Sequence, residues 1–144
     1  MTAANAGRRM IFHGLLLFLL GLLLGVVVPI VVAPRVALSG HVGTLMTAIF
    51  MMAAGTIWDR TSLSPTANAV GFWSLVYGGY GSLAGFTLAA IWGASHVTPI
   101  AGAGHEASPA QEAIVTFLIA SGGVAVLVAA VVLLWGFARG SRAN

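Results

Sequence analysis

Residues 10–33 read MIFHGLLLFLLGLLLGVVVPIVVA and contain no Asp, Glu, Lys or Arg. A helix of about 20 apolar residues crosses the hydrocarbon core of a bilayer, so this stretch is long enough to span it. It follows Arg8 and Arg9 as a signal peptide would. It nevertheless exceeds the apolar run of about 7–15 residues in secretory signals, and no small-residue cleavage site follows it. We therefore expect a retained transmembrane helix.

Three further stretches, residues 39–58, 70–94 and 111–138, are also apolar and long enough to span a bilayer. Of the 144 residues, 59% are hydrophobic and only 6% are charged, which is too apolar for a soluble domain. The connections between the stretches are too short to fold alone. The sequence predicts that residues 1–144 form one all-α domain, a polytopic four-helix bundle in a lipid bilayer.

The arginines indicate the orientation of the bundle. Four of them flank the outer ends of the first and last spans: Arg8, Arg9, Arg139 and Arg142. The positive-inside rule then places both termini in the cytoplasm, which suits a bacterial inner-membrane protein. Asp59 and Arg60 fall on the same side, whereas Arg35 opposes this orientation. Because the six arginines are scattered, we expect no nucleic-acid partner. The lack of cysteine excludes disulfides and thiolate chemistry.

Two helix starts have local sequence signals. Pro34 is expected to end the first helix, and Ser39 to cap the second one. The longest connection ends in SPAQ, in which Ser108, Pro109 and Gln111 form a capping box for the fourth helix. Glu112 follows in the first turn, where the helix dipole favours a carboxylate.

The second span contains His41 within LSGHVGTLMTAIFMM, residues 38–52. An imidazole in lipid needs a partner helix, a polar cavity or a metal. A single protein ligand suits haem, because the porphyrin supplies four nitrogens and needs mainly an apolar slot. The alternative is an interfacial His that bonds a carbonyl group. Thr44 shares a face with His41, whereas Thr47 is offset; both hydroxyls could instead bond back to their own helix.

The third span places Trp73, Tyr77 and Tyr80 at i, i+4 and i+7, so they line one stripe. A Tyr hydroxyl within a span needs a hydrogen-bond partner. These tyrosines therefore either tie two helices together or face a polar cavity that receives a small molecule. His13 in the first span is expected to anchor at the membrane interface, with a role in a pocket as the alternative.

Four segments resemble the hydroxylaminobenzene mutases, a family that belongs with the styrene oxide isomerases. They are RRMIFHGLLLFLLGLLLG (8–25), PRVALSGH (34–41), YGGYGSLAGFTLAAIWGA (77–94) and PIAGAGHEASPAQEAIV (99–115). The resemblance covers nearly the whole chain. It implies a small four-helix membrane enzyme that rearranges an aromatic substrate without a redox partner. For the isomerase branch it also implies a homotrimer with haem b, whose ferric iron acts as a Lewis acid on an epoxide oxygen.

The same resemblance implies a set of site residues. The isomerases bind the haem iron through a histidine that matches His41, and they place an asparagine six residues later, where this chain has Thr47. A third-helix tyrosine that directs the substrate matches Tyr77 or Tyr80. Mutases often have Asn two residues after the second tyrosine, where this chain has Ser82. The candidate residues are Tyr77, Tyr80 and Thr47 for catalysis, His41 and Thr44 for the haem, and Trp73 and Ser82 for the substrate pocket.

We expect a mutase that converts an N-aryl hydroxylamine to an aminophenol with the help of haem iron and without net redox change. The first alternative is an isomerase that converts an aryl epoxide of the styrene oxide type to an aldehyde. The second is a haem protein for electron transfer, which would need another axial ligand such as Met. The third is a small transporter. Small multidrug exporters depend on a carboxylate in the first span, and residues 11–33 have none.

Overall fold

The computed structural model describes the backbone of residues 3–140 and the side chains of residues 5–140. Its four long helices are α1 (Ala3–Val27), α2 (Pro34–Ile57), α3 (Pro65–Trp92) and α4 (Pro109–Gly140). Each is long and apolar enough to cross a membrane. The prediction of an all-α four-helix membrane protein is thus confirmed, while Arg142 lies outside the described residues.

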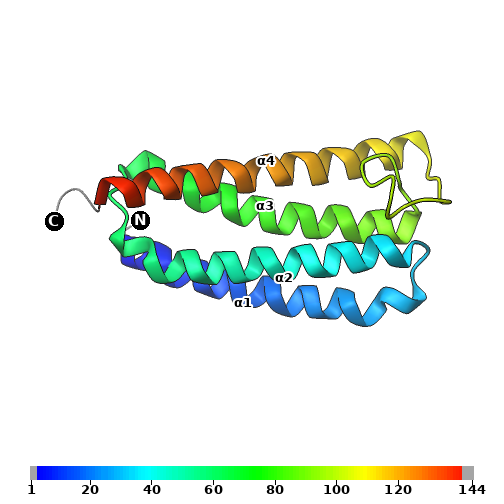
Figure 1. Cartoon of the computed structure of the whole chain (residues 1–144), viewed down its shortest axis with the longest axis horizontal. Helices are drawn as coiled ribbons and strands as arrows, with labels where there is room; N and C mark the ends of the chain where they lie inside the picture. The colour runs from blue at the N-terminus through cyan, green and yellow to red at the C-terminus, as the bar shows by residue number, and fades with distance from the viewer. Residues whose placement is uncertain (1–2, 141–144) are drawn as a thin grey trace.

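The helices run side by side along the molecule (Figure 1). The start of α1 and the end of α4 lie at one end, which we call the terminal end. The connection of residues 93–108 lies at the opposite end, which we call the distal end. Arg139 lies near the end of α4 at the terminal end, and its guanidinium carbon is 4.0 Å from the centre of the Trp135 ring.

Glycines at steps of seven residues bring α1 and α2 into close contact. A Cβ atom on Gly7 would lie 2.6 Å from the carbonyl oxygen of Gly55. One on Gly14 would lie 2.9 Å from the carbonyl oxygen of Ala48. Because Gly21 continues the same face, only glycine lets the two backbones approach along this line.

A second glycine seam joins α3 to α4. It consists of Gly71, Gly78 and Gly85, again seven residues apart. A Cβ atom on Gly78 would lie 2.6 Å from Val126 Cγ2, and one on Gly85 would lie 2.6 Å from Ile119 Cγ1. The bundle is therefore built from two tight helix hairpins, α1 with α2 and α3 with α4. They join through a core that includes the fully buried Leu17, Met51, Phe72 and Leu75.

All four helices begin before the first residue of their predicted spans, and α2 and α3 are described here. α2 begins at Pro34, because the first helical position does not need the amide that proline lacks. Ser39 is therefore inside α2, and its hydroxyl donates to a backbone carbonyl one turn earlier, so its prediction as a cap is wrong. α3 begins at Pro65 instead of residue 70, and the hydroxyl of Ser64 accepts from the Ala67 amide at 3.2 Å.

The last residue of α1 also differs from the prediction, whereas the predicted start signal of α4 is present. α1 ends at Val27, not at residue 33, because Pro29 lies in the short 3-10 turn η1 (Val28–Ile30). The capping box of α4 is confirmed. Ser108 N donates to Gln111 Oε1 at 2.9 Å, and Gln111 N donates to Ser108 Oγ at 3.4 Å.

The connection between α2 and α3 is fixed by a buried polar pair. Trp58 lies in the 3-10 turn η2 (Trp58–Arg60) and is fully buried. Its indole Nε1 donates to Oδ1 of Asn68, in α3, at 2.6 Å. Since a buried indole N–H needs an acceptor, this bond holds the start of α3 against the end of α2.

Candidate active site

The imidazole of His41 is anchored on the neighbouring helix. Its Nδ1 lies 2.8 Å from the backbone carbonyl oxygen of Gly21 in α1. A carbonyl oxygen can only accept, so Nδ1 carries the hydrogen and Nε2 keeps its lone pair. Metal-binding histidines use this arrangement, in which a hydrogen bond at one nitrogen fixes the tautomer and orients the other.

The ring of His41 lies against Gly25. A Cβ atom there would be 2.6 Å from Nδ1 and 2.7 Å from Cε1, so any larger residue would displace the ring. A groove of about 410 Å³ opens beside it and is lined by Leu22, Gly25, Val26, Val28, Pro29, Leu38 and His41. One imidazole in an otherwise apolar groove fits the edge of a porphyrin better than a bare metal ion. Among the side chains of residues 5–140, no three His, Asp or Glu cluster to hold such an ion.

The two threonines of α2 face different neighbours. Thr44 is buried, and its Cγ2 would lie 3.0 Å from a Cβ atom on Gly21, so it shares the α1-facing side with His41 as predicted. Thr47 donates its hydroxyl to the Gly43 carbonyl oxygen at 2.9 Å. Its methyl group faces Gly79 of α3. Thr44 is therefore close to His41, and Thr47 is turned toward α3.

Two of the three residues of the aromatic stripe of α3 face the outside of the bundle. Trp73 is 55% exposed and Tyr77 is 43% exposed. The Tyr77 hydroxyl lies 2.7 Å from Ser121 Oγ in α4, and this Oγ donates to the Phe117 carbonyl oxygen at 2.6 Å. Tyr77 therefore ties α3 to α4. Ser82 lies at the seam of the same two helices, opposite Gly122.

Tyr80 turns toward α1 and meets His13. Its hydroxyl lies 3.3 Å from His13 Nδ1 and 3.5 Å from the His13 carbonyl oxygen. The imidazole stands edge-on to three rings, those of Phe12, Phe72 and Tyr80, at centroid distances of 5.9, 6.0 and 5.9 Å. The sequence does not predict that these two residues meet. The histidine inside the first span was the one available sign of such a contact.

A cavity of about 470 Å³ adjoins this pair and is lined by Arg8, Arg9, Phe12 and His13. The guanidinium carbon of Arg9 lies 5.3 Å from the centre of the Phe72 ring and 6.0 Å from that of Trp73. His13 therefore both contacts the Tyr80 hydroxyl and lines a cavity.

Two regions that hold candidate residues, the His41 groove and the Tyr80–His13 pair, lie apart in one chain. Eight residues of α1, or about 12 Å of helix, separate His13 from Gly21, on which His41 is anchored. Leu22 lines the His41 groove and is nine residues from His13, about half a turn around the helix at about 100° per residue. The groove and the Tyr80–His13 pair thus lie on opposite sides of α1. His41 and Thr44 belong to the first region, and Tyr80 belongs to the second.

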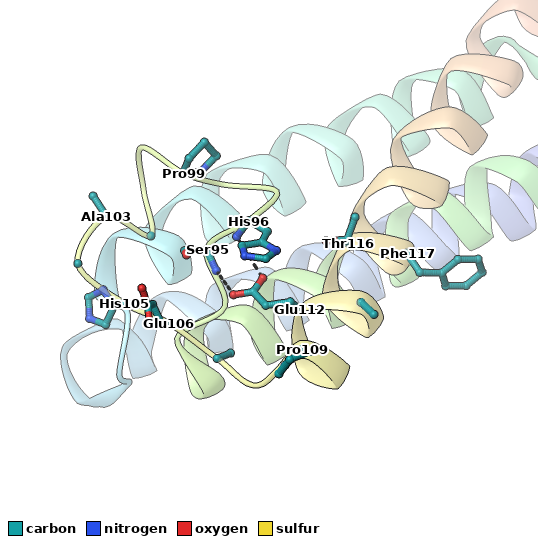
Figure 2. A pocket seen from close by; sticks show the side chains of 14 residues that line it. Ser95, His96, Pro99, Ala103, His105, Glu106, Pro109, Glu112, Thr116 and Phe117 are labelled. Carbon is teal, nitrogen blue, oxygen red and sulfur yellow. Dashed lines mark hydrogen bonds between the residues drawn. The ribbon is translucent and has the colours of Figure 1, made fainter.

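A further cavity lies at the distal end under the connection of residues 93–108 (Figure 2). Its volume is about 950 Å³. The carboxylate of Glu112 is buried and accepts from the amides of Ser95 and His96 at 2.8 and 3.1 Å. The predicted dipole contact of Glu112 is thus accompanied by a second role, that of fastening the connection to the first turn of α4.

The similarity to known proteins covers both regions. Residues 6–138 match the family described as styrene oxide isomerase. Hydroxylaminobenzene mutase HabB of Ectopseudomonas oleovorans is 38% identical over 136 residues, covering 94% of this chain and 83% of that protein. Hydroxylaminobenzene mutase HabA of the same organism is 39% identical over 127 residues, covering 88% and 94% respectively. No solved structure matches the chain. The chain therefore belongs to the styrene oxide isomerase family and is an enzyme of the isomerase type.

Proposed function

We propose that the chain is a membrane mutase that rearranges an N-aryl hydroxylamine to an aminophenol without net redox change. Two relatives named hydroxylaminobenzene mutase, each similar along most of this chain, support the substrate class. The observation that carries the proposal is the anchored imidazole of His41. The contact of Nδ1 with the Gly21 carbonyl oxygen leaves Nε2 as the nitrogen that would hold haem iron, and His41 lines an otherwise apolar groove.

Haem b is the cofactor that we propose, and His41 is the residue that would hold its iron. Gly25 leaves room for the imidazole ring, and the apolar groove beside it takes the edge of the macrocycle. Thr44, on the same face, is proposed to support this side of the cofactor site. When bound, the haem iron supplies a Lewis acid toward the oxygen of the substrate.

The chain itself binds and orients the arene. Trp73 offers an exposed aromatic face, and Tyr77 or Tyr80 offers a hydroxyl that stabilises charge developing on the substrate. We propose that Ser82, at the seam of α3 and α4, and Thr47, which faces α3 from α2, also serve the substrate. An apolar aromatic substrate reaches such residues directly from the bilayer, and the surrounding side chains keep bulk water from the electron-poor ring.

The His41 groove and the exposed residues Trp73 and Tyr77 would meet if a second copy packed against the first. The His41 groove and the α3 stripe lie on different faces of the bundle, and Trp73 and Tyr77 are exposed. A contact between one face and the other is heterologous, and such contacts close into rings. We propose a homotrimer in the bacterial inner membrane, with the arginine-rich terminal end in the cytoplasm.

An aryl epoxide is the second candidate substrate, because the matching family is described as styrene oxide isomerase. The same cofactor-holding residue, His41, and the same pocket residues would serve the rearrangement of the epoxide to an aldehyde. The two candidates differ in a direct assay. Purified protein is supplied with N-phenylhydroxylamine and, in a separate reaction, with styrene oxide. It is expected to convert the hydroxylamine to an aminophenol without added reductant. Unchanged hydroxylamine together with conversion of the epoxide would show that the mutase proposal is wrong.

A further inference from the structure

The two tyrosines of α3 differ in the groups to which their hydroxyls can pass a proton. The Tyr77 hydroxyl meets Ser121, whose own proton goes to the Phe117 carbonyl oxygen. That path ends at a backbone acceptor. The Tyr80 hydroxyl instead meets an imidazole nitrogen, a group that can both donate and accept a proton.

We infer that His13 is a positioning residue for the proposed rearrangement, and that it holds the hydroxyl of Tyr80 as the acid–base group. This inference rests on the proposed function. The bond from the Tyr80 hydroxyl to the His13 carbonyl oxygen is 3.5 Å long, so it is weak and easily redirected to a substrate. The contact to Nδ1 at 3.3 Å remains available when the hydroxyl turns.

The rearrangement needs one proton to be moved. The N–O bond breaks, a C–O bond forms at a ring carbon, that carbon loses a proton, and the nitrogen gains one. The count balances, so a single group that gives a proton and recovers one is sufficient. Tyr80 gives its proton to the substrate nitrogen as the N–O bond breaks, and it recovers one from the ring carbon after the C–O bond has formed. Between these steps the Nδ1–H of His13 donates to the phenolate oxygen and stabilises it.

The surroundings of His13 support this role. Three aromatic rings stand edge-on to the imidazole and fix its plane, so Nδ1 faces the Tyr80 hydroxyl. His13 also lines a cavity together with Arg8, Arg9 and Phe12. The imidazole is therefore held by its neighbours and not simply anchored at a membrane surface.

The test compares two substitutions of one residue. His13→Asn keeps an N–H donor near the position of Nδ1, whereas His13→Leu keeps the bulk and removes the donor. With N-phenylhydroxylamine, His13→Leu and Tyr80→Phe are each expected to lower kcat about 100-fold with little change in KM. His13→Asn should recover most of this loss, and the double variant should be no slower than the slower single one. His96→Asn, in the distal connection, serves as the control and should keep kcat within a few-fold.

The outcomes separate the inference from the proposed function. An inactive wild-type protein would show that the proposed function is wrong. If the wild type is active, two results would overturn the inference alone. The first is a kcat of His13→Leu equal to that of the wild type. The second is an equal loss of activity in His13→Asn and His13→Leu that follows their loss of thermal stability. Each kcat is divided by the concentration of folded protein, which circular dichroism measures for each variant in detergent.

Discussion

The contact between α3 and α4 at Gly78 predicts a large effect from one added methyl group. In Gly78→Ala the new Cβ atom would lie 2.6 Å from Val126 Cγ2 and 2.9 Å from the Gly122 carbonyl oxygen. Ordinary carbon contacts are about 3.5–4.0 Å, so α4 must move by about 1 Å or the seam must open. Overpacking of this kind costs about 1–3 kcal/mol. Alanine gains about 1 kcal/mol over glycine in a helix, which offsets part of that cost.

Gly123→Ala provides the matched control, because a Cβ atom at Gly123 in α4 meets nothing within 4 Å. This variant has the helix-propensity gain without the clash. Thermal unfolding followed by circular dichroism in one detergent should place Gly78→Ala several degrees below Gly123→Ala, since 1 kcal/mol corresponds to about 2–4 °C in chains somewhat longer than this one. Equal unfolding temperatures would refute the close approach of α3 and α4 at this seam.

Two further predictions concern the ends of the bundle. Glu112→Gln should loosen residues 93–108, because the charged acceptor of the Ser95 and His96 amides is lost. Hydrogen exchange at these two amides should rise at least several-fold. The control Glu106→Gln, at an exposed residue, should leave this exchange unchanged. Asn68→Leu should lower the free energy of unfolding by about 1–3 kcal/mol, because the buried Trp58 indole N–H loses its acceptor; an unaltered denaturation midpoint would contradict the role of this bond.

The number and type of helices could be predicted because hydrophobic length alone decides whether a segment can span a bilayer. Their ends were harder to predict. Pro34 was expected to end one helix, yet it begins the next, since proline suits both a break and a first turn. The capping box at Ser108 was predictable because its two hydrogen bonds join Ser108 and Gln111, which lie within four residues of sequence.

The candidate site was predictable only in part. The sequence marks His41 as a costly residue in lipid, but its anchor on Gly21 comes from another helix and depends on how α1 packs against α2. The stripe of Trp73, Tyr77 and Tyr80 follows from helical spacing, whereas the different partners of the two tyrosines do not. His13 meets Tyr80 across 67 positions of sequence, a contact that no local pattern indicates.

The most direct test of the account is the absorption spectrum of the purified protein. The wild type, expressed with adequate haem supply, is expected to show a Soret band, and His41→Ala should lose it while keeping its helical content. Gly25→Val should lose it as well, because a Cβ atom there would lie 2.6 Å from His41 Nδ1 and displace the ring without removing the ligand. A colourless wild type that still forms aminophenol would contradict the assignment of His41 as an axial ligand of haem.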